Sequence, residues 1–87
     1  MAADLEIYVE ASCTLCARAV DLAGHMREEF PDARIELIDL TDGGGVHRRL
    51  VVATPTYVLN GRVFSLGNPA PSELRAELAR LLAEVGP

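Results

Sequence analysis

The sequence of 87 residues predicts one α/β domain with a mixed four-stranded sheet flanked by helices. Three observations predict this class. A strand-like apolar run, a long segment of helical periodicity and a second apolar run follow one another in the first half of the chain. Two further apolar runs are joined by Asn60-Gly61, a dipeptide typical of tight hairpins. The last segment repeats leucines at helical spacing. The predicted order is therefore βαβ followed by ββα.

The first half of the chain has the pattern of a βαβ unit. Leu5–Glu10 alternates apolar and polar residues and is expected to form the first strand. A helix is expected from about Thr14–Phe30, with Ser12 as its N-cap and Pro31 ending it, because a residue before proline avoids helical angles. Arg34–Leu40 is rich in Ile and Leu and predicts a second strand, parallel to the first.

A connecting segment and a hairpin follow. We expect a loop over Thr41–Gly45, which contains three consecutive glycines, and a short helix over Val46–Val52. The third strand is predicted over Thr56–Leu59 and the fourth over Arg62–Leu66. The Asn60-Gly61 dipeptide between them favours a type I′ turn, so these strands should be antiparallel neighbours.

The closing helix is predicted over about Glu73–Val85. Ser72 is a suitable N-cap, and Gly86 is expected to end the helix. The apolar residues of this segment should form one buried stripe: Leu74, Leu78, Leu81, Leu82 and Val85.

Composition narrows the class of protein. The apolar fraction of 49% is sufficient for a packed core, and the net charge is −5. All eight basic residues are arginine, and apart from Arg48-Arg49 they are not clustered, which argues against nucleic acid as a partner. The first ten residues lack the apolar stretch of a signal peptide, and no segment has the length and hydropathy of a membrane span. We therefore expect a cytoplasmic monomer that occupies residues 1–87 as one domain.

The two cysteines lie together in Ser12-Cys13-Thr14-Leu15-Cys16. A helix that starts near Cys13 places Cys16 about one turn further on, on the same face. Their Cα atoms would then lie about 5–6 Å apart, a separation that a disulfide spans without strain. The positive end of the helix dipole favours a thiolate, so we expect a lowered pKa for the Cys13 thiol. Cys16 should be more buried and react second.

Two other interpretations of the cysteine pair remain open. An inert disulfide or a pair of buried thiols is the simplest alternative. A tetrahedral zinc site needs four ligands, and the pair supplies two. His25 lies about three turns along the predicted helix, too far to share an ion with Cys13, and His47 is the other histidine of the chain. We expect no metal and no cofactor.

Other residues are candidates for partner binding. His47, Arg48 and Arg49 lie on the predicted crossover, where they could bind a carboxylate of glutathione or of an acidic partner; a solvated basic turn is the alternative. An apolar rim around the cysteines could dock a partner, although ordinary packing would explain the same residues: Leu15, Val52, Pro55 and Pro69.

Taken in order, these motifs resemble a known family. The cysteine motif at a strand-to-helix turn, Thr54-Pro55 before the third strand, and the hairpin followed by Gly67 and a closing helix are similar to small thioredoxin-fold proteins of the glutaredoxin-like or mini-thioredoxin kind. The resemblance covers nearly the whole chain. It implies a thioredoxin-like fold, with a cis Pro55 packed beside Cys13 and Cys16. It also implies that the Thr54 backbone pairs with an extended substrate peptide or with glutathione.

The chain departs from that family at several positions. Thioredoxins usually carry Trp where this chain has Ser12, Gly-Pro where it has Thr14-Leu15, and a buried Asp where it has Ile7. Proton transfer to the second cysteine would therefore need water or another group. Glutaredoxins often place Lys upstream of the motif, where this chain has Glu10, and hold glutathione with a turn that here reads Gly67-Asn68-Pro69.

The resemblance and the cysteine spacing predict a thiol–disulfide oxidoreductase. Cys13 would attack a substrate disulfide and Cys16 would resolve the mixed disulfide, with Leu15, Thr54 and Pro55 contacting the substrate. The expected partners are a disulfide-containing protein or a low-molecular-weight thiol, together with a reductase as electron donor. The alternative is a non-catalytic thioredoxin-fold module that binds a partner or a metal through its thiols.

Overall fold

The computed structural model describes residues 2–41 and 53–84. The elements follow one another in the order β1 (Asp4–Val9), α1 (Cys16–Glu29), β2 (Arg34–Asp39), β3 (Thr56–Leu59), β4 (Arg62–Leu66) and α2 (Pro71–Ala83). The expected short helix over Val46–Val52 and nearly all of the expected loop before it lie outside the described residues.

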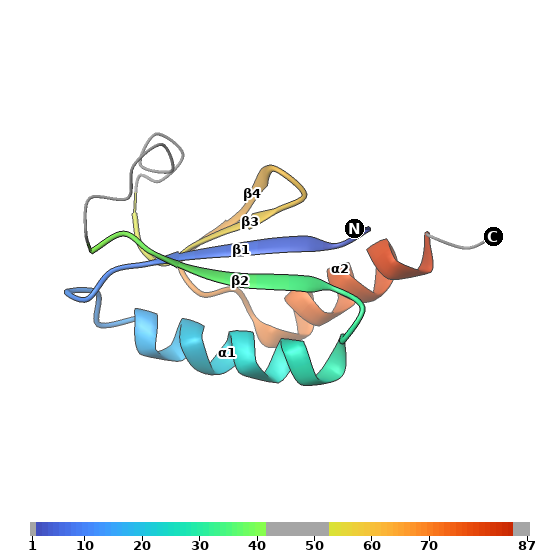
Figure 1. The fold of residues 1–87 in the computed structure, drawn as a ribbon, viewed down its shortest axis with the longest axis horizontal. Coiled ribbons are helices and arrows are strands. Elements are labelled where there is room, and N and C mark those ends of the chain that lie inside the picture. The colour runs from blue at the N-terminus through green and yellow to red at the C-terminus, as the bar shows by residue number, and fades with distance from the viewer. Residues whose placement is uncertain (1, 42–52, 85–87) are drawn as a thin grey trace.

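The strands form one mixed sheet in the order β2-β1-β3-β4. β1 runs parallel to β2, with Asp4 opposite Arg34, whereas β3 is antiparallel to both β1 and β4. This arrangement confirms the predicted βαβ and ββα halves. Figure 1 shows α1 and α2 on the same side of the sheet, below it in that view.

The main core fills the space between the sheet and the two helices. Alternate residues of β1 point to that side, and α1 contributes one stripe at helical spacing. Leu74 and Leu78 of α2 are fully buried, and Leu81 and Leu82 pack against the cluster at partial burial. Val85 and Gly86, the expected end of the stripe and of the helix, lie outside the described residues. The buried members from the strands and α1 include Leu5, Ile7, Val9, Ile35, Tyr57, Leu59, Cys16, Ala19, Leu22, Ala23 and Met26.

Both helices begin differently from the sequence prediction. α1 starts at Cys16, with Leu15 as its N-cap residue and no side-chain cap, so the predicted start near Thr14 and the Ser12 cap are wrong. α2 starts at Pro71 after Ala70, so Ser72 lies inside the first turn and does not cap the helix. The reason in α2 is that proline has its φ already near the helical value and lacks the N–H that would need a partner, which suits it to the first helical position.

The hairpin turn between β3 and β4 is also bound to the start of β1. Asn60 and Gly61 both have positive φ, 50° and 82°, as the predicted type I′ turn requires. The Asn60 backbone N–H donates to the Asp4 carbonyl at 2.8 Å. Its side-chain Oδ1 accepts from the Asp4 N–H at 2.8 Å, and its Nδ2 donates to the Ala2 carbonyl at 2.9 Å. The turn thus fixes the N-terminal end of the central strand.

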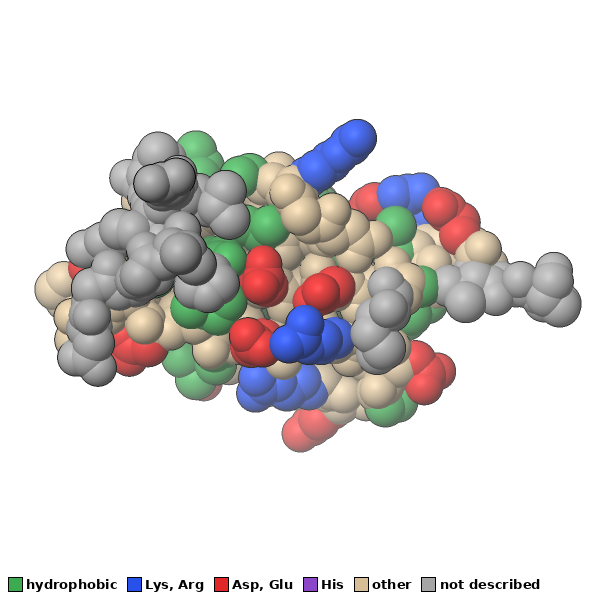
Figure 2. All heavy atoms as spheres, turned by 45° about the horizontal axis from the view of Figure 1, so that its top comes forward, with side chains coloured by type: hydrophobic (Ala, Val, Ile, Leu, Met, Phe, Trp, Pro, Cys, Tyr) green, Lys and Arg blue, Asp and Glu red, His purple; other side chains and the backbone are tan. Residues whose placement is uncertain are grey.

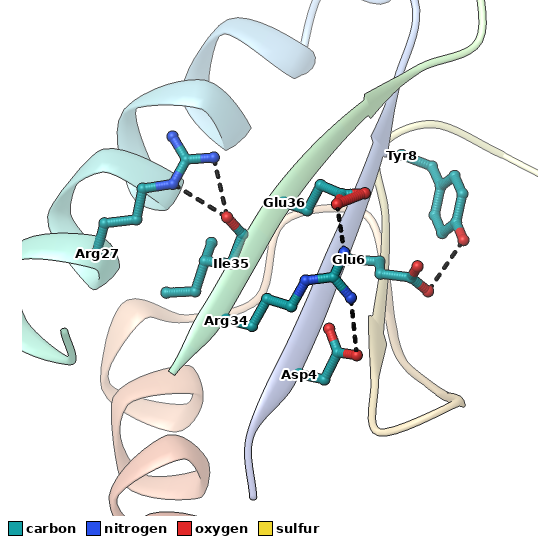
Figure 3. Close-up of polar contacts among 7 residues, drawn as sticks. All are labelled: Asp4, Glu6, Tyr8, Arg27, Arg34, Ile35 and Glu36. Atoms are coloured by element: carbon teal, nitrogen blue, oxygen red, sulfur yellow. Dashed lines mark hydrogen bonds and ion pairs between the residues drawn. The ribbon is translucent and has the colours of Figure 1, made fainter. Parts of the chain in front are cut away.

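The second face of the sheet combines a small apolar cluster with charged side chains. Tyr8, Leu40 and Val58 are buried together. On β1 and β2, Arg34 pairs with Asp4 and Glu36, at 3.5 and 2.9 Å (Figure 3). Figure 2, in which the top of Figure 1 is turned towards the viewer, shows acidic and basic side chains next to one another in the middle of the molecule.

Two further polar contacts belong to β1 and β2. The Tyr8 hydroxyl donates to Glu6 at 3.1 Å, and burial together with this acidic neighbour raises the pKa of Tyr8 to about 12 (Figure 3). Arg27 of α1 donates twice to the Ile35 carbonyl, at 3.1 and 3.0 Å, on the edge strand β2 (Figure 3).

Among the described residues, neither helix has the length and apolar character that crossing a membrane requires.

Candidate redox site

The two cysteines form a disulfide at the entry to α1. Their Cα atoms are 5.4 Å apart, within the predicted range. The Cys16 N–H donates to the Cys13 carbonyl at 3.3 Å, and the Cys13 N–H donates to the Glu10 carbonyl at 3.1 Å. The chain therefore makes two successive tight turns between β1 and α1. Cys16 is the first residue of the helix, and Cys13 lies three residues before it.

The two sulfur-bearing residues differ in exposure. Cys16 is 5% exposed and belongs to the main core, whereas Cys13 is half-buried at the edge of that core. Thr14 and Leu15 between them are exposed, Leu15 to 56%. The prediction that Cys16 is the more buried of the two is confirmed, and a partner molecule can approach Cys13 more easily.

The surroundings of Cys16 are apolar. Ile7 is fully buried in the same cluster as Cys16. Among the described residues, Thr56 is the buried side chain of the polar or charged class, and no Asp, Glu, Arg or His side chain is buried in the core.

Thr54 and Pro55 lie at the same end of the sheet as the disulfide. The register pairs Tyr8 with Thr56, so Pro55 lies beside the C-terminal end of β1, from which the cysteine loop departs. The Thr54–Pro55 peptide bond is cis. Pro55 is buried, and its carbonyl accepts from the Gly67 N–H at 2.8 Å. Thr54 is half-buried, and its backbone makes no hydrogen bond within the described part of the chain.

Asn68 connects the cysteine loop to the sheet. Its Oδ1 accepts from the Tyr57 hydroxyl of β3 at 2.8 Å, and its Nδ2 donates to the Leu15 carbonyl at 3.0 Å. Leu15 is the residue directly before Cys16. One side chain therefore holds the segment between the two cysteines against a strand of the sheet.

Sequence reasoning did not find this role of Asn68, because the contact joins residues far apart in the chain. The only signal was that a turn residue with both a donor and an acceptor stands two positions after the fourth strand.

Comparison with known proteins supports the assignment of the fold. No family model matches the sequence, and no curated protein matches it either. Solved structures do match. Thioredoxin O2 from Arabidopsis thaliana in the oxidized state has a TM-score of 0.69 and 18% identity, covering 91% of this chain and 74% of that one. Mitochondrial thioredoxin 3 from Saccharomyces cerevisiae, also oxidized, has a TM-score of 0.71 and 19% identity, covering 90% and 77%. The chain has the thioredoxin fold.

A third solved structure, Fasciola hepatica thioredoxin, gives a TM-score of 0.68 at 17% identity, with 90% of this chain and 79% of that one covered. The predicted fold class is therefore confirmed.

Beside the cysteine loop, the thioredoxin fold of this chain carries a surface hollow of about 350 Å³. Leu15 and Pro69 line it, as members of the predicted apolar rim, together with Arg18, Asn68 and Ala70. Pro55 is buried and does not line the hollow, and Val52 lies outside the described residues.

Tyr57 links this hollow to the sheet. Burial raises the pKa of Tyr57 to about 12, although the positive charge of Arg18 acts in the opposite direction.

The structure describes one of the two histidine candidates. His25 is exposed on α1. His47, Arg48 and Arg49 lie outside the described residues. Among the residues that the structure describes, no group of three or more His, Cys, Asp or Glu side chains could hold a metal ion.

Proposed function

We propose that this chain is a thiol–disulfide oxidoreductase that reduces disulfides of proteins or of small thiols. The observation that carries the proposal is the Cys13–Cys16 disulfide at the entry to α1, in a thioredoxin fold, with the outer cysteine accessible and the inner one buried. α1 begins three residues after Cys13, and the positive end of its dipole favours the Cys13 thiolate, which is the attacking species.

The reaction consists of two exchange steps. In the reduced protein, the Cys13 thiolate attacks one sulfur of the substrate disulfide, forms a mixed disulfide and releases the other substrate sulfur as a thiolate. Cys16 then loses its proton to solvent and attacks the Cys13 sulfur. The Cys13–Cys16 disulfide forms, the second substrate sulfur leaves as a thiolate, and two electrons have passed to the substrate. A reductase or a low-molecular-weight thiol must return two electrons to begin a new cycle.

Backbone pairing with the substrate is part of the proposal. The Thr54 backbone, which has open hydrogen-bonding groups next to the disulfide, supports the addition of an extended substrate segment, with Leu15 and Pro55 bordering it. We place this activity in the cytoplasm and assign it to a monomer.

The test uses the two single-cysteine variants with an insulin disulfide or a peptide disulfide as substrate. Cys13→Ser should abolish turnover completely and form no mixed disulfide. Cys16→Ser should also lose turnover but should accumulate a mixed disulfide through Cys13, detected as an added mass that dithiothreitol removes. Circular dichroism of both variants serves as the folding control. If folded Cys16→Ser traps nothing, the exchange mechanism is wrong.

The direction of electron flow is tested by the reduction potential of the cysteine pair. Equilibration in glutathione buffers with mass readout should give a value near about −270 mV, the range of a reductase. A value near about −120 mV would instead indicate an oxidant of other proteins.

A further inference from the structure

The arginines of the chain differ in what their guanidinium groups contact. Four of the six in the described residues are held within the protein: Arg27 by the Ile35 carbonyl, and three by carboxylates, namely Arg34, Arg75 and Arg80. Arg18 and Arg62 have no carboxylate or hydrogen-bond partner within that part of the chain. Arg62 is the first residue of β4, next to the hairpin turn, and pairs with Leu59, which lies opposite Leu5 near the N-terminal end of β1; the cysteine loop departs from the other end of β1.

Arg18 is placed beside the redox centre. It lies in the first turn of α1, two residues after Cys16, and three residues after Leu15, so its side chain emerges on the same side of the turn as Leu15. Both residues line the hollow of about 350 Å³ next to the cysteine loop. Arg18 is the one charged residue among those lining it, in a protein whose net charge is −5.

The remaining residues that line the hollow determine which other contacts a ligand would make. Leu15, Pro69 and Ala70 offer apolar surface. Asn68 is already bonded to the Leu15 carbonyl and the Tyr57 hydroxyl, so its amide is fixed in orientation. A ligand group that fits these walls has a short aliphatic stem and ends in an anion that the guanidinium can bind.

We propose that Arg18 is a specificity-determining residue that selects disulfide substrates carrying a carboxylate close to the reacting sulfur. The carboxylate binds in the hollow between Leu15 and Pro69 while Cys13 attacks the disulfide. This inference rests on the proposed oxidoreductase function. The carboxylate can come from a small acidic disulfide or from an acidic residue next to a cysteine in a protein.

The test compares two small disulfides that differ only in charge: 3,3′-dithiodipropionate and its neutral diamide. The kcat/KM ratio of the acid to the amide is measured for the parent protein, for Arg18→Gln and for Arg62→Gln. Arg62→Gln is a matched control, because it removes the same charge from an equally unpaired arginine far from the disulfide. Arg18→Gln should lower the ratio by about two- to fivefold, the factor expected of a partly exposed ion pair, and Arg62→Gln should leave it unchanged.

Two further arms identify the source of the carboxylate. A peptide disulfide with Glu next to cysteine is compared with the same peptide carrying Gln. If the Arg18 effect appears only with the small acid, the subsite serves low-molecular-weight disulfides. If it also appears with the peptide, the subsite recognises an acidic residue next to the cysteine of a protein substrate. Raising the salt concentration should weaken the preference in either case, because the site is open to solvent.

The outcomes separate this inference from the function on which it rests. If the neutral diamide is reduced by the parent and the charge ratio is the same in parent and Arg18→Gln, the subsite is refuted and the oxidoreductase function stands. An equal fall of the ratio in both arginine variants would refute it as well, because net charge alone would explain the preference. If the folded parent reduces neither these two disulfides nor the disulfides of insulin, both proposals fail.

Discussion

Asn60 and Asn68, at opposite ends of the sheet, each form side-chain hydrogen bonds that join distant segments of the chain. Each uses the oxygen and the nitrogen of its side-chain amide to join a turn to a distant segment. Asn60 holds the hairpin turn against the start of β1, far from the disulfide. Asn68 holds the cysteine loop against Tyr57 of β3. The two residues differ in the segment that they hold. Asn60 holds a strand end with a structural role, whereas Asn68 holds the loop that contains the two reacting sulfurs.

This pair of residues allows stability and redox reactivity to be measured separately. Loss of either tie should destabilise the fold, but only the loss of the Asn68 tie should alter the equilibrium between dithiol and disulfide. The three predictions below test that separation.

The largest change in stability is expected from Asn60→Ala. The variant loses two side-chain hydrogen bonds and places alanine at a φ of 50°, which only a few residue types tolerate. The free energy of unfolding should fall by about 2–3 kcal/mol, measured by urea denaturation. Asn60→Gly, which tolerates this φ, should lose less. The reduction potential should equal that of the parent in both variants, and a shift in either would contradict the separation.

Asn68→Ala should have a smaller effect on stability and a distinct effect on the disulfide. The free energy of unfolding should fall by about 1–2 kcal/mol, because the buried Tyr57 hydroxyl loses its acceptor. The tie to the Leu15 carbonyl holds the loop in the shape that closes the disulfide, so its loss should favour the dithiol. If the tie is worth about 1 kcal/mol more in the oxidised protein, the reduction potential rises by about 20 mV.

The measurement for Asn68→Ala is equilibration in glutathione buffers alongside Asn60→Ala. Equal potentials for the two variants would show that the cysteine loop keeps its shape without Asn68.

Tyr57→Phe should have the smallest effect at neutral pH, about 1 kcal/mol, because it removes one hydrogen bond and keeps the ring. Its pH dependence is more informative. The pKa of Tyr57 is raised from 10.0 to about 12 in the folded protein, mainly by burial. The unfolded chain therefore releases the phenolic proton first, so this contribution to stability is complete below pH 10 and is lost as the pH rises towards 12.

The Tyr57→Phe variant has no hydroxyl to titrate at position 57, so its stability does not change with pH through this group. Urea denaturation at several alkaline pH values should show the parent losing its advantage over Tyr57→Phe between pH 10 and 12. Tyr8, whose pKa is also about 12, affects both proteins equally and cancels in the comparison. A constant difference across this range would mean that the Tyr57 hydroxyl is accessible to solvent in the folded protein.

The fold was predictable from the sequence because its strands and helices are local patterns. The strand bounds agree within a residue, and Asn60-Gly61 forms the expected turn, since both depend on neighbouring residues. The helix starts were wrong because a cap is decided by backbone geometry: at α2 proline takes the first position, and at α1 a tight turn closed by the Cys13 carbonyl comes before the helix.

The candidate site was only partly predictable. The cysteine spacing fixed the separation of their Cα atoms, and the position in the chain indicated which one is more buried. The roles of Asn68 and Arg18 depend on which distant elements meet at the cysteine loop. Asn68 bonds to residues of a helix entry and of a strand, and no periodicity in the sequence encodes that contact.

The contact between Arg27 and the Ile35 carbonyl limits how copies of this chain can assemble. An uncovered edge strand is a template on which another chain can pair. On β2, strand addition at this carbonyl would first have to displace two hydrogen bonds from Arg27. The opposite edge of the sheet is β4. Arg27 therefore opposes the pairing of a second chain with this part of β2.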